Sequence, residues 1–424
     1  MRSTQSLRIV VTGLIAQHPA LGGVAWDYLQ YPAGLLRLGH DVYYFEDSGE
    51  WPYTLDGGAS GQDWVAHDPT ANVRHLSKVM ERFGLGDRWA YRFAINPRWY
   101  GISDSERAEV LRSADLVLNV SGALEHPEHY RSVKRLAYID SDPVFTQVKL
   151  ALGDELRDFR QRVDIHDVHF SFGECLGERL PETGYTWLPT RQPILLDEWH
   201  PAAPHDETFT TVMSWTSYKP LLYNGIAYGQ KDREFARFLD LPSRVRPAKL
   251  EVAVGGLQHA EWESVFANHP GNNRRTEPPA QLSAADLLRQ FGWSVVDPLQ
   301  CCSNLDTYRA YIESSKGELA VAKNGYVVGQ PGWFSCRSAC YLAAGRPAIV
   351  QDTGFSAVVP AGEGVVLFSS PEEAAAAIGE VEADYQRHAQ SAVAIAHEYF
   401  NSHRVLNRLL EDTFNEASLT KAIA

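Results

Sequence analysis

Apolar runs alternate with helix-patterned segments from the start of the chain. Residues 7–15 form an apolar run, and residues 16–23 have the composition of a loop. Residues 24–39 carry apolar positions at helical spacing and end at Gly39, before a second apolar run at 40–47. This order predicts a βαβ unit at the beginning of the chain.

The same alternation continues as far as Ile194. Further strands are predicted at residues 115–122, 135–142, 168–175 and 185–194. Segments with a helical pattern, such as residues 105–114, lie between them, so we expect a mostly parallel sheet. Residues 195–207 then hold two prolines and no long apolar period, which is typical of a linker between domains.

A second unit of the same class follows the linker. Its strands are predicted at residues 208–215, 249–256, 293–298, 317–325 and 347–355, and its helices at 231–241, 283–292 and 305–316. From Pro371 the pattern is helical to the end. A chain of 424 residues suits two domains of roughly 200 residues each. We therefore predict two doubly wound, Rossmann-like α/β domains at 1–194 and 208–385, with final helices at 386–424.

Charge and composition restrict the possible partners. The formal net charge of −14 argues against a broad electropositive face for nucleic acid, whereas a small phosphorylated ligand remains compatible. No run approaches the ~18 apolar residues of a membrane-spanning helix. The five cysteines show no CxxC pair and no zinc-ligand spacing, so we expect reduced thiols in a cytoplasmic protein.

The stretch 332–355 carries the clearest candidate chemistry. Glycines precede a helix of small residues, whose first N–H groups would form a seat for phosphate. Arg337 in the first turn has the wrong sign for the helix dipole, so we expect it to contact an anion or a facing carboxylate, or simply to lie on the surface. Asp352 and Thr353 end the next strand, where the aspartate either accepts hydrogen bonds from a sugar or caps the turn before Gly354.

These motifs resemble a known family. The order of glycine loop, small helix, "GRP", apolar strand, "DTGF" and "VVPAGEGVVLFSSPEEAAAAI" is similar to the donor-binding half of GT-B-fold glycosyltransferases. The segment "GGVAWDYLQYPAGLLRLGHDVYYFE" resembles the glycine loop, helix and strand that open many of them. The resemblance implies two domains facing a cleft, with the final helices packing back toward the N-terminal domain.

The resemblance also implies a donor site in the C-terminal domain. Gly332 and Ser335 lie where the family's diphosphate loop is found, and Asp352 lies where a residue often contacts the donor sugar. Lys219 or Lys231 could be the basic residue that meets the diphosphate. A helix N-terminus and a cation can stabilise the leaving diphosphate, so neither a metal nor a cofactor is expected.

This chain departs from two subfamilies. Gly332 and Cys340 occupy the positions of two glutamates found in many retaining members, so that mechanism cannot be transferred. In plant natural-product members a glutamate contacts the ribose, and Ser338 stands at its position here, with Gln330 at that of a histidine. The resemblance therefore leaves Ser338 or Gln330 as the candidate for contacting the ribose.

The acceptor side is predicted from the N-terminal loops. His18 follows the first strand and is the candidate base of an inverting reaction. Asp140 and Asp142 end another strand and could act as base, as a partner that orients the base, or as turn caps. Four residues of the acceptor loops are candidates for acceptor binding: Gly22, Gly23, Trp51 and Tyr53.

We therefore expect a metal-independent glycosyltransferase that moves a sugar from a nucleotide diphosphate to a small-molecule or glycan acceptor. Two alternative hypotheses are compatible with the same fold: a nucleotide-sugar epimerase or hydrolase, and a non-catalytic protein that binds a nucleotide sugar.

Overall fold

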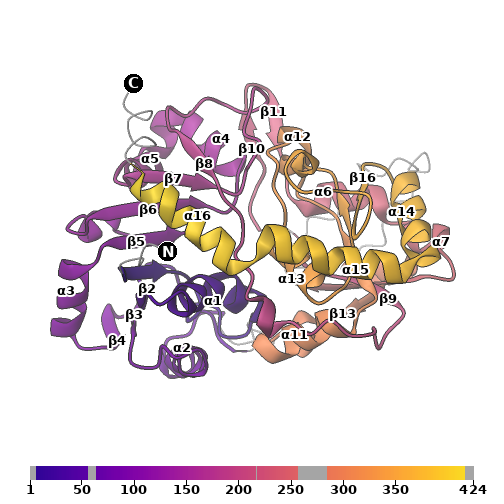
Figure 1. Ribbon diagram of the computed structural model, residues 1–424. Coiled ribbons are helices and arrows are strands. Elements are labelled where there is room, and N and C mark those ends of the chain that lie inside the picture. The colour runs from indigo at the N-terminus through magenta and orange to yellow at the C-terminus, as the bar shows by residue number, and fades with distance from the viewer. Residues whose placement is uncertain (1–5, 56–63, 216, 256–283, 416–424) are drawn as a thin grey trace.

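The computed structural model describes residues 6–55, 64–215, 217–255 and 284–415. These residues form two Rossmann-like halves, which lie side by side in Figure 1 with the helices α15 (Tyr385–Ile395) and α16 (Ser402–Phe414) spanning both. The fold prediction of two α/β units is confirmed.

The N-terminal sheet has the strand order β4-β3-β2-β1-β5-β6-β7-β8. Its strands are β1 (Arg8–Thr12), β2 (Asp41–Glu46), β3 (Trp89–Phe93), β4 (Arg98–Gly101), β5 (Leu116–Val120), β6 (Arg135–Asp140), β7 (Val168–Ser171) and β8 (Trp187–Pro189). All neighbours are parallel except β3 and β4, which form an antiparallel pair that the apolar pattern did not predict. Along β1, Ile9 and Val11 enter one hydrophobic cluster and Val10 enters another, so the sheet is covered on both faces.

The C-terminal sheet is parallel throughout and has the order β13-β12-β9-β14-β15-β16. Its strands are β9 (Thr208–Ser214), β12 (Lys249–Gly255), β13 (Ser294–Val296), β14 (Gly317–Ala320), β15 (Ala348–Gln351) and β16 (Val365–Phe368). A separate antiparallel hairpin, β10 (Leu221–Tyr223) and β11 (Ile226–Tyr228), follows β9.

Helices connect the strands in both halves. Those of the N-terminal half are α1 (Gly22–Arg37), α2 (Thr70–Arg82), α3 (Asp104–Ser113), α4 (Phe145–Ala151) and α5 (Arg157–Asp164). Those of the C-terminal half are α6 (Lys231–Phe235), α7 (Leu241–Arg244), α9 (Ala284–Gln290), α10 (Pro298–Cys301), α11 (Leu305–Ser314), α12 (Asn324–Gly329), α13 (Cys336–Ala343) and α14 (Pro371–Ala383). Short 3-10 turns are η1 (Pro127–Tyr130), η2 (Gly153–Leu156), η3 (Leu196–Glu198), η4 (Ala236–Phe238) and η6 (Phe355–Ala357), and a π-helical turn, η7 (Ala396–Phe400), joins α15 to α16.

Some predicted boundaries differ from the structure. The strand predicted at 317–325 stops at Ala320, and the residues that follow become α12 rather than continuing the strand. The predicted strand at 185–194 contains only the three residues of β8. Parts of the elements predicted at 249–256 and 283–292 lie outside the described residues.

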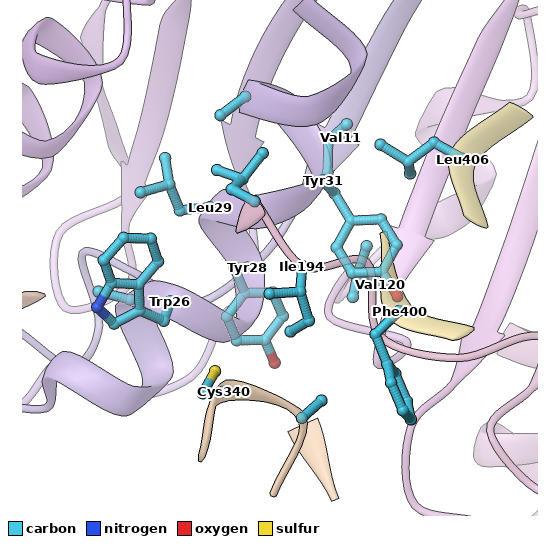
Figure 2. Close-up of a cluster of buried hydrophobic side chains, with 14 of the residues drawn as sticks. Val11, Trp26, Tyr28, Leu29, Tyr31, Val120, Ile194, Cys340, Phe400 and Leu406 are labelled. Atoms are coloured by element: carbon cyan, nitrogen blue, oxygen red, sulfur yellow. The ribbon is translucent and has the colours of Figure 1, made fainter. Parts of the chain in front are cut away.

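One hydrophobic cluster joins the two halves. It contains Tyr28 and Leu29 of α1, Cys340 of α13 and Leu406 of α16, which Figure 2 shows packed around Ile194. At the start of α1 the backbones also meet, because the Gly22 N–H donates to the Cys302 carbonyl at 2.8 Å. The helix α1 therefore serves as a shared wall between the two sheets.

The crossing back to the N-terminal half takes place at η7. Gly364, which leads into β16, approaches the backbone of Ala392 in α15, so that helix still belongs to the C-terminal half. Beyond the turn, Ile194 and Asn401 form a bridge, and Leu406 of α16 packs against Gly34 of α1. The final helices thus pack first against the C-terminal half and then against the N-terminal half.

Candidate active site

The amino end of α13 lies over the carboxyl edge of the C-terminal sheet. Ser335 is its N-cap residue, yet its side chain makes no capping hydrogen bond. The first N–H groups of the helix therefore remain available to an external acceptor. Beside them is a small cavity of about 20 Å³, and its lining includes Lys231, Ser335, Arg337, Ser338, Thr353 and Phe355.

Two polar groups in this cavity have no anionic partner. Ser338 is 1% exposed, and its hydroxyl oxygen has no hydrogen-bond partner among the described residues. Lys231, the first residue of α6, forms no ion pair with any residue that the structure describes. Burial lowers the pKa of the Lys231 ammonium well below its usual value, and the nearby Arg337 guanidinium lowers it further. An anion bound beside Lys231 would favour its charged form and raise this pKa again.

Arg337 has a carboxylate partner from within its own half. Its guanidinium donates to Glu318 of β14, which is fully buried, and to the Val212 carbonyl at 2.7 Å. Burial alone would lower the pKa of Arg337, but the Glu318 carboxylate raises it above its usual value. Of the expected alternatives, the structure gives Arg337 the facing carboxylate, so its charge is fixed beneath the helix end.

Asp352 and Thr353 lie beside this cavity and are engaged locally. One carboxylate oxygen of Asp352 accepts the Gly354 N–H at 2.9 Å, which is the turn-capping alternative. The Thr353 hydroxyl donates to the Trp333 carbonyl. The second Asp352 oxygen receives no hydrogen bond from the described residues, so contact with a sugar remains a prediction.

Gly332 meets the N-terminal half instead of open space. Its φ of +78° lies in the left-handed region, and a Cβ there would come within 2.7 Å of the Cys175 sulfur. The Cys175 N–H also donates to the Pro331 carbonyl at 2.8 Å. The glycine loop of the C-terminal half therefore packs directly against Cys175 of the N-terminal half.

Lys219 lies away from this cavity. It is exposed and precedes the β10–β11 hairpin, whereas Lys231 follows the hairpin and begins α6. Of the two lysines proposed for the diphosphate, the structure brings only Lys231 together with Arg337 and Ser338.

Asp140, at the end of β6, is completely engaged. It is 1% exposed and its two oxygens accept from the Asp142 N–H, the Thr146 and Ser171 hydroxyls and the Gln147 amide. A carboxylate offers about four acceptor positions, so none is left for a substrate proton. This geometry fits the turn-capping alternative.

Asp142 reaches across to the other half. Its carboxylate accepts from the Lys323 ammonium at 2.8 Å, the Tyr218 hydroxyl at 2.5 Å and the Tyr326 hydroxyl. Burial would raise the pKa of Asp142, but the Lys323 charge and these hydrogen bonds bring it below its usual value. Asp142 is therefore an ionised contact that links the two halves.

His18 lies in the loop after β1 and stacks on Tyr53, with ring centroids 4.8 Å apart. Burial lowers the pKa of His18 to about 4. Just before it, the N–H groups of Ala16 and Gln17 donate to the buried Glu46 carboxylate at the end of β2. The loop is thus held in place, and the imidazole is neutral near pH 7.

The remaining acceptor-loop candidates contact different neighbours. Trp51 is exposed, and Tyr53 is partly exposed against His18. Gly22 and Gly23 face the start of α11. A Cβ added at Gly22 would lie 2.1 Å from the Asn304 carbonyl oxygen, and one added at Gly23 would lie 2.9 Å from the Tyr308 ring. The glycines therefore permit the two halves to approach closely, and acceptor binding by them remains a prediction.

The sequence and the structure of this chain were compared with those of known proteins. No family model and no curated protein sequence matches this chain. A sucrose-phosphate synthase from Thermosynechococcus elongatus is similar in structure, with a TM-score of 0.52, 12% identity and coverage of 96% of this chain and 99% of that one. An alpha-glucosyltransferase in complex with UDP and DNA has a TM-score of 0.54 and 12% identity, with coverage of 97% of this chain and 100% of that one. HepE from Anabaena with UDP-glucose has a TM-score of 0.54 and 12% identity, with coverage of 96% of this chain and 98% of that one.

The chain has the GT-B fold. The resemblance noted in the sequence is confirmed at this level, across both halves of the chain.

Several residues at the junction of the GT-B halves or beside the cavity were not predicted. Lys323 was assigned to a strand, and Glu318 and Tyr326 were not considered. Asp27 on α1 was also missed: it accepts a hydrogen bond from the Cys336 thiol, and burial raises its pKa to about 6 although Cys336 and Arg337 oppose the shift. A carboxylate on an otherwise buried helix face is the signal that could have identified Asp27.

In the described part of the chain, no group of three or more histidine, cysteine or acidic side chains could hold a metal ion, and no helix is long and apolar enough to cross a membrane.

Proposed function

We propose that this protein is a glycosyltransferase that moves a sugar from a nucleotide diphosphate to an acceptor hydroxyl. The donor diphosphate would bind at the amino end of α13, over the mouth of the cavity, because the cavity itself, at about 20 Å³, has room for little more than one water molecule. HepE and the alpha-glucosyltransferase, which share the GT-B fold, were solved with UDP-glucose and UDP respectively. We take the donor class from these relatives and the position from the geometry of this chain.

One observation carries the proposal: Lys231, the Ser338 hydroxyl and the first N–H groups of α13 converge on one cavity, where Lys231 forms no ion pair and Ser338 no hydrogen bond with the described residues. Each of these groups is costly to bury without a partner. A diphosphate would accept from all three at once. The nearby Glu318 carboxylate pairs with Arg337, so it forms no ion pair with Lys231.

The chemistry follows from that placement. The bond between the anomeric carbon and the diphosphate oxygen breaks, and its electron pair passes to the diphosphate. Lys231 and the end of α13 stabilise that charge, which is why we propose a reaction that needs neither metal nor cofactor. The acceptor oxygen forms the new bond and its proton passes to a base, for which His18 is the candidate on the N-terminal side.

The acceptor would be a small molecule or a glycan, and the protein would act in the cytoplasm. The formal net charge of −14 makes nucleic acid an unfavourable acceptor for this chain.

Two matched lysine variants test the donor site. We expect UDP-glucose or another nucleotide diphosphate sugar, titrated by calorimetry, to bind the native protein. Lys231→Ala should lose about 1.5–3 kcal/mol of binding free energy, and Ser338→Ala about 1 kcal/mol. Lys219→Ala, which removes an exposed lysine, should bind as the native protein does.

Equal affinities for Lys231→Ala and Lys219→Ala would refute the site. Release of free sugar or an epimer without any acceptor would instead identify a hydrolase or epimerase, and donor binding without turnover over a broad acceptor panel would indicate a binding protein.

A further inference from the structure

A second pocket of about 510 Å³ lies where the C-terminal helices return to the N-terminal half. Thr190 and Arg191, just after β8, form one wall. Val358 of the C-terminal half forms another, and the residues of η7 and α16 close the third side. The pocket thus lies beyond the carboxyl ends of parallel strands, where α/β folds commonly bind ligands.

Its floor is rigid and charged. Arg191 donates to Glu174 at 2.5 Å, and its guanidinium stacks over the rings of Tyr399 and Phe400, with 5.6 and 5.7 Å to their centroids. The Arg191 and Glu174 side chains are 19% and 10% exposed, so this pair is fixed and largely satisfied. Arg191 supplies positive potential, while the aromatic rings supply an apolar surface.

Two further arginines stand at the rim. Arg404 and Arg408 are one turn apart on α16, so their side chains lie on the same face of the helix. Their side chains are 61% and 71% exposed. Arg404 pairs with Glu398, itself 60% exposed, and Arg408 is 3.6 Å from Asp412. Exposed pairs of this kind contribute little to stability, so an incoming anion can replace the carboxylates at small cost.

The charge balance of the pocket differs from that of the whole chain. Three arginines and two glutamates line it, in a protein whose formal net charge is −14. Arginine guanidinium groups match the geometry of phosphate oxygens. Glu398, once released from Arg404, accepts hydrogen bonds from hydroxyl groups, whereas Glu174 stays paired with Arg191. A ligand with one anionic end and several hydroxyls uses both sets of groups.

We propose that this pocket binds a small phosphorylated sugar, with its phosphate on Arg404 and Arg408 and its hydroxyls on Glu398. The ring of the sugar lies against Tyr399, and the volume of about 510 Å³ suits a ligand of this size.

The site is separate from the donor cavity. The Phe355 ring lines that cavity, and Phe334 packs between Phe355 and Phe400, with centroids 4.8 and 5.1 Å apart. This aromatic row divides the two spaces, so binding here does not depend on the proposed glycosyltransferase activity. Because both halves line the pocket, we expect its ligand to stabilise their packing.

Glucose 6-phosphate is the probe, titrated by calorimetry into the full-length protein without any nucleotide, with glucose and inorganic phosphate as comparison ligands. We expect glucose 6-phosphate to bind, and Arg404→Ala/Arg408→Ala to weaken it at least ~10-fold. Arg387→Ala is the matched control, because Arg387 is also exposed at 60% and pairs with the exposed Glu363. That control and Lys231→Ala should bind within about 2-fold of the native protein.

Absence of glucose 6-phosphate binding up to ~10 mM would overturn the proposal. So would unchanged affinity in Arg404→Ala/Arg408→Ala, or equal binding of inorganic phosphate and the sugar phosphate, since the second result would reduce the site to a simple anion site. Loss of binding in Lys231→Ala alone would place the ligand in the donor cavity and also overturn it.

Discussion

The Asp142 carboxylate and the Lys323 ammonium lie 2.8 Å apart and tie the two halves of the GT-B fold together. Asp142 follows β6 in the N-terminal half, while Lys323 is the N-cap residue of α12 in the C-terminal half. Their side chains are 30% and 20% exposed, so the pair is partly shielded from water. The Tyr218 and Tyr326 hydroxyls, which also donate to Asp142, add to the same contact.

We predict a measurable coupling between these two residues. Asp142→Asn leaves Lys323 without its charge partner, and Lys323→Met leaves Asp142 without its own. Because the pair is only partly buried, we expect a coupling free energy of about 1–2 kcal/mol in a double-mutant cycle of urea denaturation. The exposed Arg387–Glu363 pair should give a value near zero. Equal coupling in the two cycles would show that Asp142 and Lys323 do not hold the halves together.

Gly22 provides a steric test of the same junction. A Cβ at this position would lie 2.1 Å from the Asn304 carbonyl oxygen, which is backbone and cannot turn away. Gly22→Ala should therefore destabilise the protein by about 1–3 kcal/mol, by forcing α1 and α11 apart.

Gly379 is the matched control for that substitution. It lies inside α14 and nothing lies within 4 Å of an added Cβ. Gly379→Ala should stabilise the protein by about 0.5–1 kcal/mol, since alanine favours the helix. Denaturation midpoints of the two variants should thus move in opposite directions; a Gly22→Ala midpoint at or above that of the native protein would contradict the close packing.

Most strands of the two sheets were predictable because each is a short apolar run, although β3, β4 and β16 were not among those predicted. The parallel arrangement followed from the alternation of these runs with helices. The position of the lysines was not predictable from spacing. The β10–β11 hairpin, whose short strands resemble loop sequence, separates the two lysines. Lys219 lies before the hairpin and away from the cavity, whereas Lys231 lies after it and lines the cavity. Likewise the Asp142–Lys323 pair joins residues far apart in sequence, which no local pattern encodes.

Glu46 should make stability depend on pH. Its carboxylate is fully buried, and burial raises its pKa from 4.5 to about 7 despite hydrogen bonds from Ala16, Gln17 and Tyr44. A raised pKa means that the folded state binds the proton more tightly than the unfolded state. Its contribution is therefore complete below about pH 4.5 and is lost as the pH rises through 7.

Glu46→Gln is neutral at every pH and isolates this effect. Between pH 4.5 and 8 the native protein should lose about 3 kcal/mol of unfolding free energy relative to Glu46→Gln. Urea denaturation of both proteins across this range measures the difference; a constant difference would mean that Glu46 titrates normally.

His18, if it is the base, should produce an unusual pH profile. Burial lowers the pKa of its imidazole to about 4, so the ring is neutral and able to accept a proton at any pH well above 4. We therefore expect kcat/KM to stay level between pH 6 and 8, where an enzyme with an ordinary histidine base of pKa about 6.5 would lose activity on acidification.

His18→Ala should lower kcat by about 10²–10⁴-fold and leave donor affinity unchanged. His40→Gln is the control, because His40 is also buried but precedes β2, at the opposite edge of the sheet, and should leave kcat unaffected. Equal losses of kcat and donor affinity in His18→Ala would remove His18 from the role of base.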